Sequence, residues 1–117
     1  MSEIRSHRDL IVWQKAVEFG IELYRQTQTF PDSERFGLVS QLRRASVSIA
    51  SNIAEGYGRG STADYVRFLR NARGSLFEID TQLLFAYRLR YLEQTKYDEV
   101  LSQHNEVGRL LAGLIRT

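Results

Sequence analysis

The sequence contains no cysteine and only one proline, and these two shortages already exclude several kinds of protein. Without cysteine there are no disulfides, no Cys-ligated zinc and no thiol chemistry. With one proline among 117 residues, the chain is not a linker-rich or low-complexity sequence. No apolar run is long enough to cross a bilayer, and residues 1–9 lack the apolar centre of a signal peptide. We therefore expect a cytoplasmic protein that does not use a membrane.

Strand-like alternation of apolar and polar residues is also missing, and helical patterns fill nearly the whole chain. A length of 117 residues suffices for one domain with a real core. Breaks at Phe30–Ser33 and Gly56–Gly60, and capping residues at Asp9, Ser61 and Thr95, predict helices over about 9–29, 33–55, 61–91 and 95–116. Short connections favour an all-α fold, a single antiparallel up-down-up-down four-helix bundle over residues 1–117.

Two of the predicted helices carry more apolar residues than one buried stripe needs. In the first helix we expect the stripe from Leu10 and Trp13 to Ile21 and Tyr24 to enter the core, although a second stripe lies roughly opposite. Surplus apolar surface marks an interface, so we predict a homo-oligomeric ring; the alternative is scattered residues covered by the termini. The predicted interface residues are Val12, Phe19, Leu23, Val66, Phe77 and Leu84.

The second helix carries a polar ridge beside its apolar stripe, with members three or four residues apart. Such a ridge is either a solvated face or a buried hydrogen-bond network. Because the neighbouring helices are apolar on extra sides, we favour the network and expect Arg44, Ser48, Asn52 and Glu55 to be largely buried. The predicted members of this structural network are Gln41, Arg44, Ser48, Asn52, Glu55 and Glu78.

Positive charge is concentrated in the middle of the chain. The formal net charge is +2, but residues 35–73 alone carry seven arginines against Glu55 and Asp64. Arginine pairs in a bidentate way with phosphate, and Arg59 precedes a new helix N-terminus, where anions are favoured. The alternatives are an ordinary solvated helix face, or internal ion pairs in a protein–protein interaction module. The predicted RNA- or DNA-binding residues are Arg43, Arg59, Arg67, Arg70 and Arg73.

Catalysis has little support in the sequence. The two histidines, His7 and His104, lie far from the polar ridge along the chain. Glu55 and Glu78 could form an acid–base pair across two helices, but salt bridges to Arg44 or Arg73 explain them better. We expect no catalytic residues, no metal site, no cofactor and no enzymatic activity.

Several longer motifs together carry a family resemblance. They are Asp9–Ala16, Phe30-Pro31, Glu34–Leu38, Gln41–Ala45, Ser51–Arg59, Phe68-Leu69, Ala72, Gly74–Leu76 and Glu78. With these motifs the chain resembles the bacterial four-helix-bundle proteins encoded within intervening sequences of 23S ribosomal RNA genes. It is also similar to the accessory variability proteins of diversity-generating retroelements.

The resemblance implies a homopentameric barrel of four-helix bundles that is not an enzyme. In the retroelement relatives the pentamer binds nucleic acid and a reverse transcriptase through a basic surface, and RNA binding is suspected for the intervening-sequence proteins. A protein partner of that kind is therefore an alternative to direct nucleic-acid binding. Arg90 stands where glycine is frequent in the family, so we expect the third helix to run on further.

Overall fold

Four α-helices and two short 3₁₀ turns make up residues 3–116, the part of the chain that the computed structural model describes, and no strand occurs within it. The helices are α1 (Ile11–Thr27), α2 (Leu38–Gly58), α3 (Thr62–Arg88) and α4 (Gln94–Arg116), and the 3₁₀ turns are η1 (His7–Asp9) and η2 (Asp32–Glu34). The predicted all-α class with four helices is confirmed.

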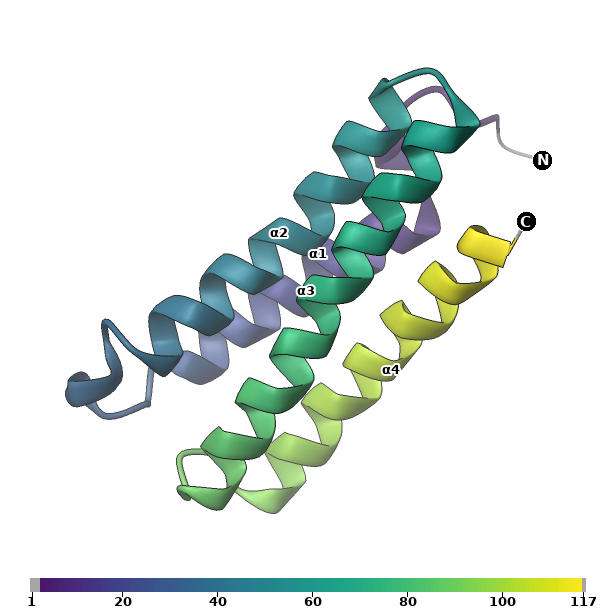
Figure 1. Cartoon of the computed structure of the whole chain (residues 1–117). Coiled ribbons are helices and arrows are strands. Elements are labelled where there is room, and N and C mark those ends of the chain that lie inside the picture. The colour runs from purple at the N-terminus through teal and green to yellow at the C-terminus, as the bar shows by residue number, and fades with distance from the viewer. Residues whose placement is uncertain (1–2, 117) are drawn as a thin grey trace.

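The helices pack side by side, with each one contacting its neighbours in chain order. The most extensive packing joins α2 to α3, and α1 lies against both α2 and α4. Figure 1 shows α2 and α3 meeting at a short turn at one end of the bundle, and α3 and α4 meeting at the other end. The molecule is elongated, with principal extents of 42 × 27 × 21 Å. Whatever α3 presents outward is therefore displayed along much of one long side.

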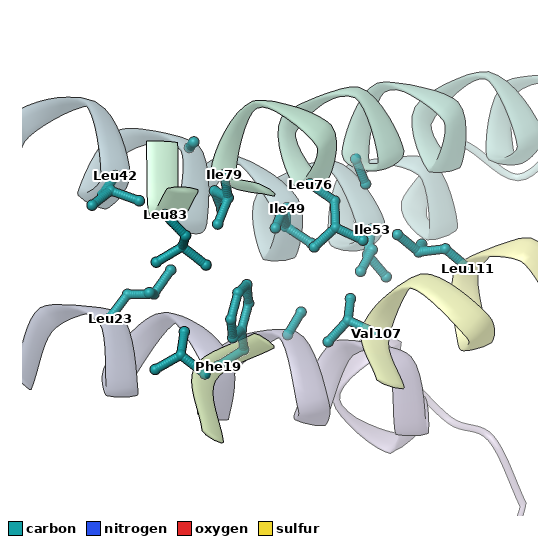
Figure 2. Close-up of a cluster of buried hydrophobic side chains, with 14 of the residues drawn as sticks. Phe19, Leu23, Leu42, Ile49, Ile53, Leu76, Ile79, Leu83, Val107 and Leu111 are labelled. Atoms are coloured by element: carbon teal, nitrogen blue, oxygen red, sulfur yellow. The ribbon is translucent and has the colours of Figure 1, made fainter. Parts of the chain in front are cut away.

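All four helices contribute aliphatic or aromatic side chains to one core (Figure 2). Phe19 and Leu23 come from α1 and are no more than 1% exposed. Burial of such side chains contributes about 1.5–3 kcal/mol each, so this cluster dominates the stability of the bundle. Its other labelled members are Leu42, Ile49, Ile53, Leu76, Ile79, Leu83, Val107 and Leu111.

The core contradicts half of the predicted oligomer interface. Val12, Phe19 and Leu23 are buried inside the bundle and cannot contact another copy. Of the stripe expected in the core, Ile21 and Tyr24 lie toward solvent, 48% and 40% exposed, whereas Leu10 and Trp13 are partly buried and pack against the core. Two apolar stripes on one helix are equivalent at the level of periodicity, and only packing against α2 and α4 decides which one turns inward.

The starts of α1 and α2 also differ from the prediction. Asp9 is not the cap of α1, because its carboxylate accepts a hydrogen bond from the Arg5 backbone N–H at 2.8 Å and closes η1. The helix begins only at Ile11. Similarly, α2 begins at Leu38, whose N–H donates to Glu34 Oε1 at 3.1 Å, after the separate turn η2. In both places a carboxylate accepts backbone hydrogen bonds just before the helix.

Both ends of α3 are well defined. As predicted, Ser61 caps the start, with its Oγ accepting from the Asp64 N–H at 3.2 Å. The expected extension beyond residue 90 is wrong, because α3 ends at Arg88. Arg90 takes the left-handed conformation, with φ 67°, and the Tyr91 N–H returns to the Ala86 carbonyl at 2.8 Å. The backbone therefore makes a glycine-type helix end although the residue is an arginine.

Candidate nucleic-acid interface

Four of the five arginines predicted to bind nucleic acid gather around the first half of α3. Arg67, Arg70 and Arg73 follow one another at three-residue intervals on α3, and Arg59 is the C-cap residue of α2. The chain turns within three residues because Gly60 adopts a φ of 82°. This turn places Arg59 beside the start of α3. We call Arg59, Arg67, Arg70 and Arg73 the basic surface.

Arg59 and Arg67 share one aromatic ring. Their guanidinium carbons lie 5.0 and 4.6 Å from the centroid of Phe68. Each also pairs with a carboxylate, Arg59 with Glu55 at 2.6 Å and Arg67 with Asp64 at 3.2 Å. All four charged groups are substantially exposed, and exposed pairs contribute only about 0–1 kcal/mol. Internal pairing thus describes these two arginines, but it leaves them free to exchange a carboxylate for a phosphate.

Arg70 and Arg73 differ from the first pair. Arg70 is exposed and Arg73 is half-buried, and neither forms an ion pair with a carboxylate in residues 3–116. Gly74 directly follows Arg73 on α3. It is exposed and has open space where a side chain would be. A phosphate backbone can therefore approach α3 closely here, next to two positive charges without compensation.

Arg43 does not join the basic surface. Its Nε donates to Thr27 Oγ1 at 3.0 Å, and an Nη donates to the Tyr24 carbonyl at 3.3 Å. The guanidinium also stacks 4.7 Å from the Tyr24 ring centroid. These contacts satisfy a carbonyl in the last turn of α1 and tie that helix to α2. The structure thus separates Arg43 from the other four predicted residues and gives it a bracing contact.

The polar ridge forms a real but smaller network than predicted. Ser48 Oγ and Ser75 Oγ lie 2.9 Å apart and join α2 to α3. Asn52 Nδ2 donates to the Ser48 carbonyl at 2.8 Å, and these residues are half-buried. The predicted burial of Arg44 and Glu55 is wrong, because both are exposed. The helices approach too closely at this seam for long side chains, which turn out to solvent.

The two remaining members of the predicted network lie outside the seam. Gln41 is exposed and accepts a hydrogen bond from Gln82 Nε2 at 3.4 Å, while Glu78 is exposed on α3. Neither Glu78 nor Glu55 bonds to Ser48 or Asn52. The hydrogen-bond network between α2 and α3 therefore consists of short side chains at its centre.

Aromatic side chains of α2 and α3 pack next to the basic surface. A Cβ on Gly56 would lie 2.6 Å from the Phe68 Cβ, so only glycine allows α2 to approach α3 at this point. The Tyr57 and Tyr65 rings meet edge to face, with centroids 6.2 Å apart. Within residues 3–116 the Tyr65 hydroxyl is buried and has no hydrogen-bond partner. Burial, and secondarily the neighbouring Tyr57, raises the pKa of Tyr65.

The second half of α3 exposes three large apolar side chains, and its one arginine, Arg88, is the last residue of the helix. Phe77 is 63%, Phe85 59% and Leu84 38% exposed, and we call these three residues the apolar surface. Val66, also predicted in the interface, is half-buried. Thus Val66, Phe77 and Leu84 remain accessible to a second copy, whereas the three predicted interface residues of α1 are buried in the core.

A second apolar region lies between α1 and α2. It is a groove of about 410 Å³, walled by Trp13, Val17, Ile21, Tyr24 and Val47. Small residues also line the groove, namely Gly20, Ala50 and Ala54, so few side-chain atoms fill it. This groove contains most of the α1 stripe that was expected in the core.

The candidate catalytic side chains are engaged elsewhere. His104 is buried, and its Nε2 donates to the Leu76 carbonyl at 2.9 Å, while His7 packs on Trp13 with ring centroids 5.0 Å apart. Across residues 3–116 no three His, Asp or Glu side chains cluster in a way that could hold a metal ion. In the same range no helix is both long and apolar enough to span a bilayer.

One basic residue of this region was missed by the sequence reasoning. Arg109 of α4 lines the same cavity between α3 and α4 as Arg73. No sequence signal identifies it, because its position depends on the register of α4 against α3.

Comparison with known proteins places the fold and the motifs in context. The family model described as 23S rRNA-intervening sequence protein matches residues 8–113. A solved structure from Bacteroides thetaiotaomicron VPI-5482, described as a protein with unknown function from the S23 ribosomal protein family, is similar with a TM-score of 0.84 and 25% identity. The similarity covers 92% of this chain and 96% of that one. No curated protein matches the chain.

Proposed function

Because the chain belongs to the 23S rRNA-intervening sequence protein family, we propose that it is a non-catalytic helical scaffold that binds RNA or DNA by charge. The observation that carries this proposal is the basic surface, where Arg70 and Arg73 lack carboxylate partners in residues 3–116 and Gly74 leaves the helix open. Contacts between arginine and phosphate supply affinity without reading sequence. We therefore expect strong salt dependence and weak base preference.

The proposed scaffold is a cytoplasmic homopentameric ring of antiparallel up-down-up-down bundles. Two unlike regions support it: the apolar surface protrudes from α3, whereas the α1–α2 groove is hollow and floored by small residues. Unlike patches on one protomer make head-to-tail contacts, which generate a ring when the rotation closes. The number five comes from the family resemblance. Each added copy would repeat the basic surface, and linked weak contacts bind far more tightly than single ones.

A protein-interaction module is the alternative function. Arg59 and Arg67 already pair with Glu55 and Asp64, which weakens the case for phosphate as their natural partner. A partner protein with an acidic surface would suit the same arginines, and a reverse transcriptase is the example that the family resemblance suggests. This alternative predicts no direct binding of nucleic acid by the isolated protein.

The test is binding of single-stranded RNA and duplex DNA, measured by fluorescence anisotropy over a range of salt concentrations. We expect Arg70→Gln combined with Arg73→Gln to weaken binding of all sequences and to lower the slope of log affinity against log salt by about one per arginine. The control combines Arg25→Gln with Arg116→Gln, which removes the same charge from exposed positions outside α3.

Two results would contradict the proposal. If the unaltered protein binds neither RNA nor DNA at low salt, the scaffold does not bind nucleic acid and the protein-partner alternative is favoured. If the control pair weakens binding as much as the α3 pair, net charge and not the basic surface is responsible. Thermal melting by circular dichroism checks that both variants remain folded.

A further inference from the structure

The groove between α3 and α4 holds two arginines that face one cavity. Arg73 of α3 and Arg109 of α4 both line this cavity, which has a volume of about 510 Å³ (α3 and α4 lie side by side in Figure 1). Asn105, Gly108 and Phe77 also line it. In the described part of the chain neither arginine pairs with a carboxylate. The cavity therefore carries two positive charges without internal compensation.

The two helices are held in fixed register at this groove. The Leu76 backbone carbonyl can only accept, so His104 Nε2 carries the hydrogen of their 2.9 Å bond and ties α4 to α3. The His104 ring also packs edge-on against Phe19 in the core, with centroids 6.0 Å apart. A Cβ on Gly108 would lie 3.3 Å from Leu76 Cδ2, so the helices are close here. His104 is thus a positioning residue that holds Arg73 and Arg109 across one groove.

Nearby acidic groups do not neutralise the groove. Glu106, the α4 carboxylate closest to Arg109 in sequence, pairs with Lys15 of α1 at 3.9 Å. Asp80 and Glu78 of α3 are exposed and do not line the cavity. Within residues 3–116 no carboxylate therefore pairs with Arg73 or Arg109, and both guanidinium groups are available to an anionic ligand.

The charge and the donor set select a class of ligand. A phosphodiester inside a nucleic-acid chain carries one negative charge, whereas a terminal phosphomonoester carries about two at neutral pH. Two guanidinium forks can bind such a dianion with several charge-assisted hydrogen bonds. Asn105 lines the same cavity, and because its Oδ1 lies 3.1 Å from His104 Nδ1, its Nδ2 group remains as a further donor.

We propose that the α3–α4 groove binds the terminal phosphomonoester of a nucleic-acid chain, so that the protein distinguishes chain ends from chain interiors. This inference rests on the proposed function for the kind of molecule that carries the phosphate. Arg73 joins the two sites, because it belongs to the basic surface and also lines the groove. A strand bound along the basic surface can therefore end in the groove.

The experiment compares three RNA oligomers of one sequence with an internal fluorophore: one has a 5′-phosphate, one a 3′-phosphate, and one hydroxyls at both ends. We expect the unaltered protein to bind one phosphorylated form about tenfold more tightly than the hydroxyl form. Arg109→Gln should reduce this ratio to about one, since the second guanidinium is lost. The matched control, Arg70→Gln, should weaken all three oligomers alike and keep the ratio.

Each outcome separates the inference from the proposed function. Equal binding of all three oligomers by the unaltered protein overturns the inference and leaves the proposed function standing. No binding of any oligomer overturns both. A ratio that survives Arg109→Gln excludes this groove as the site of discrimination. Inorganic phosphate provides a test without a variant. At equal ionic strength, phosphate should displace the preferred phosphorylated oligomer more effectively than chloride does. The hydroxyl oligomer should show a smaller difference between the two salts.

Discussion

The two halves of α3 expose side chains of different chemical character. The first half carries Arg67, Arg70 and Arg73, whereas the second half exposes Leu84 and Phe85. Behind both halves runs one uninterrupted buried stripe, from Phe68 and Leu69 to Leu83 and Ala86. The core thus fixes where α3 lies and leaves its outer face free to differ along its length. In consequence, substitutions in the second half of α3 can change its apolar side chains without touching the arginines of the first half.

The largest effect is expected from removing two of the three side chains of the apolar surface without touching the core. Leu84→Ser combined with Phe85→Ser should convert the assembled protein into a 13.6 kDa monomer, because both side chains are exposed in the single chain. Nucleic-acid affinity should fall by about a hundredfold or more as multivalent contacts are lost. Light scattering measures the mass, and Ile4→Ser, an exposed apolar residue before η1, is the control.

Either of two results would break this comparison. If the double variant keeps the mass of the unaltered protein, the apolar surface does not mediate assembly. If the unaltered protein is itself monomeric, the exposed side chains of α3 serve another partner.

Local signals were sufficient to predict the four helices. Ser61 is followed by helix-compatible residues and caps α3 as expected, and Pro31 separates α1 from α2. The choice between the two stripes of α1 could not be predicted, because Phe19 and Ile21 are equally apolar in the sequence. Only packing against α2 and α4 decides that Phe19 is 1% and Ile21 48% exposed.

The candidate site could be predicted only where it belongs to one stretch of chain. Arg59, Arg67 and Arg70 share a turn and a helix, so their proximity follows from local structure. Arg43 was grouped with them because charge alone does not show that it bonds to Thr27 of α1. Arg109 was missed for the same reason, because residues brought together by tertiary packing leave no local pattern.

The next largest effect concerns the close contact between α2 and α3 next to the basic surface. In Gly56→Ala the new Cβ would lie 2.6 Å from Phe68 Cβ and 3.3 Å from the Tyr65 carbonyl oxygen. Overpacking of this kind costs about 1–3 kcal/mol, which exceeds the gain of about 1 kcal/mol in helix propensity. The free energy of unfolding, measured with denaturant, should therefore fall.

Gly74→Ala is the matched control for this substitution. Gly74 also lies within a helix but has nothing within 4 Å of its added Cβ, so the same change should raise stability by about 1 kcal/mol. Opposite signs for the two glycines are expected. If both substitutions stabilise the protein, the close approach of α2 and α3 is not required.

A smaller effect is expected at the turns that bound the two halves of α3. Gly60 precedes the basic half with φ 82°, and Arg90 follows the apolar half with φ 67°. A residue with a Cβ loses about 1 kcal/mol in this conformation, so Arg90→Gly should raise the free energy of unfolding by that amount. The converse change, Gly60→Ala, should lower it by a similar amount. An unchanged or lower stability of Arg90→Gly would show that its side chain outweighs the backbone strain.

The smallest effect concerns the buried hydroxyl beneath the basic surface. The raised pKa of Tyr65 comes from burial first and from Tyr57 second, so the folded protein holds this proton to higher pH than the unfolded chain does. Its contribution is therefore complete below the unfolded pKa of about 10 and is lost as pH rises through the folded value. Tyr65→Phe removes both the titration and the unpaired hydroxyl, so it should be neutral or stabilising by about 1 kcal/mol or less at pH 7.

The measurement is denaturant unfolding of both proteins between about pH 8 and pH 11. Stability should decline less steeply in Tyr65→Phe than in the unaltered protein. Tyr91 needs its own control, because a hydrogen bond to Glu34, then burial and the Glu34 charge, raise its pKa too, and Tyr91→Phe should leave the Tyr65 contribution in place. If Tyr65→Phe and the unaltered protein lose stability in parallel, the Tyr65 hydroxyl is solvated. In that case water reaches the aromatic packing next to the basic surface.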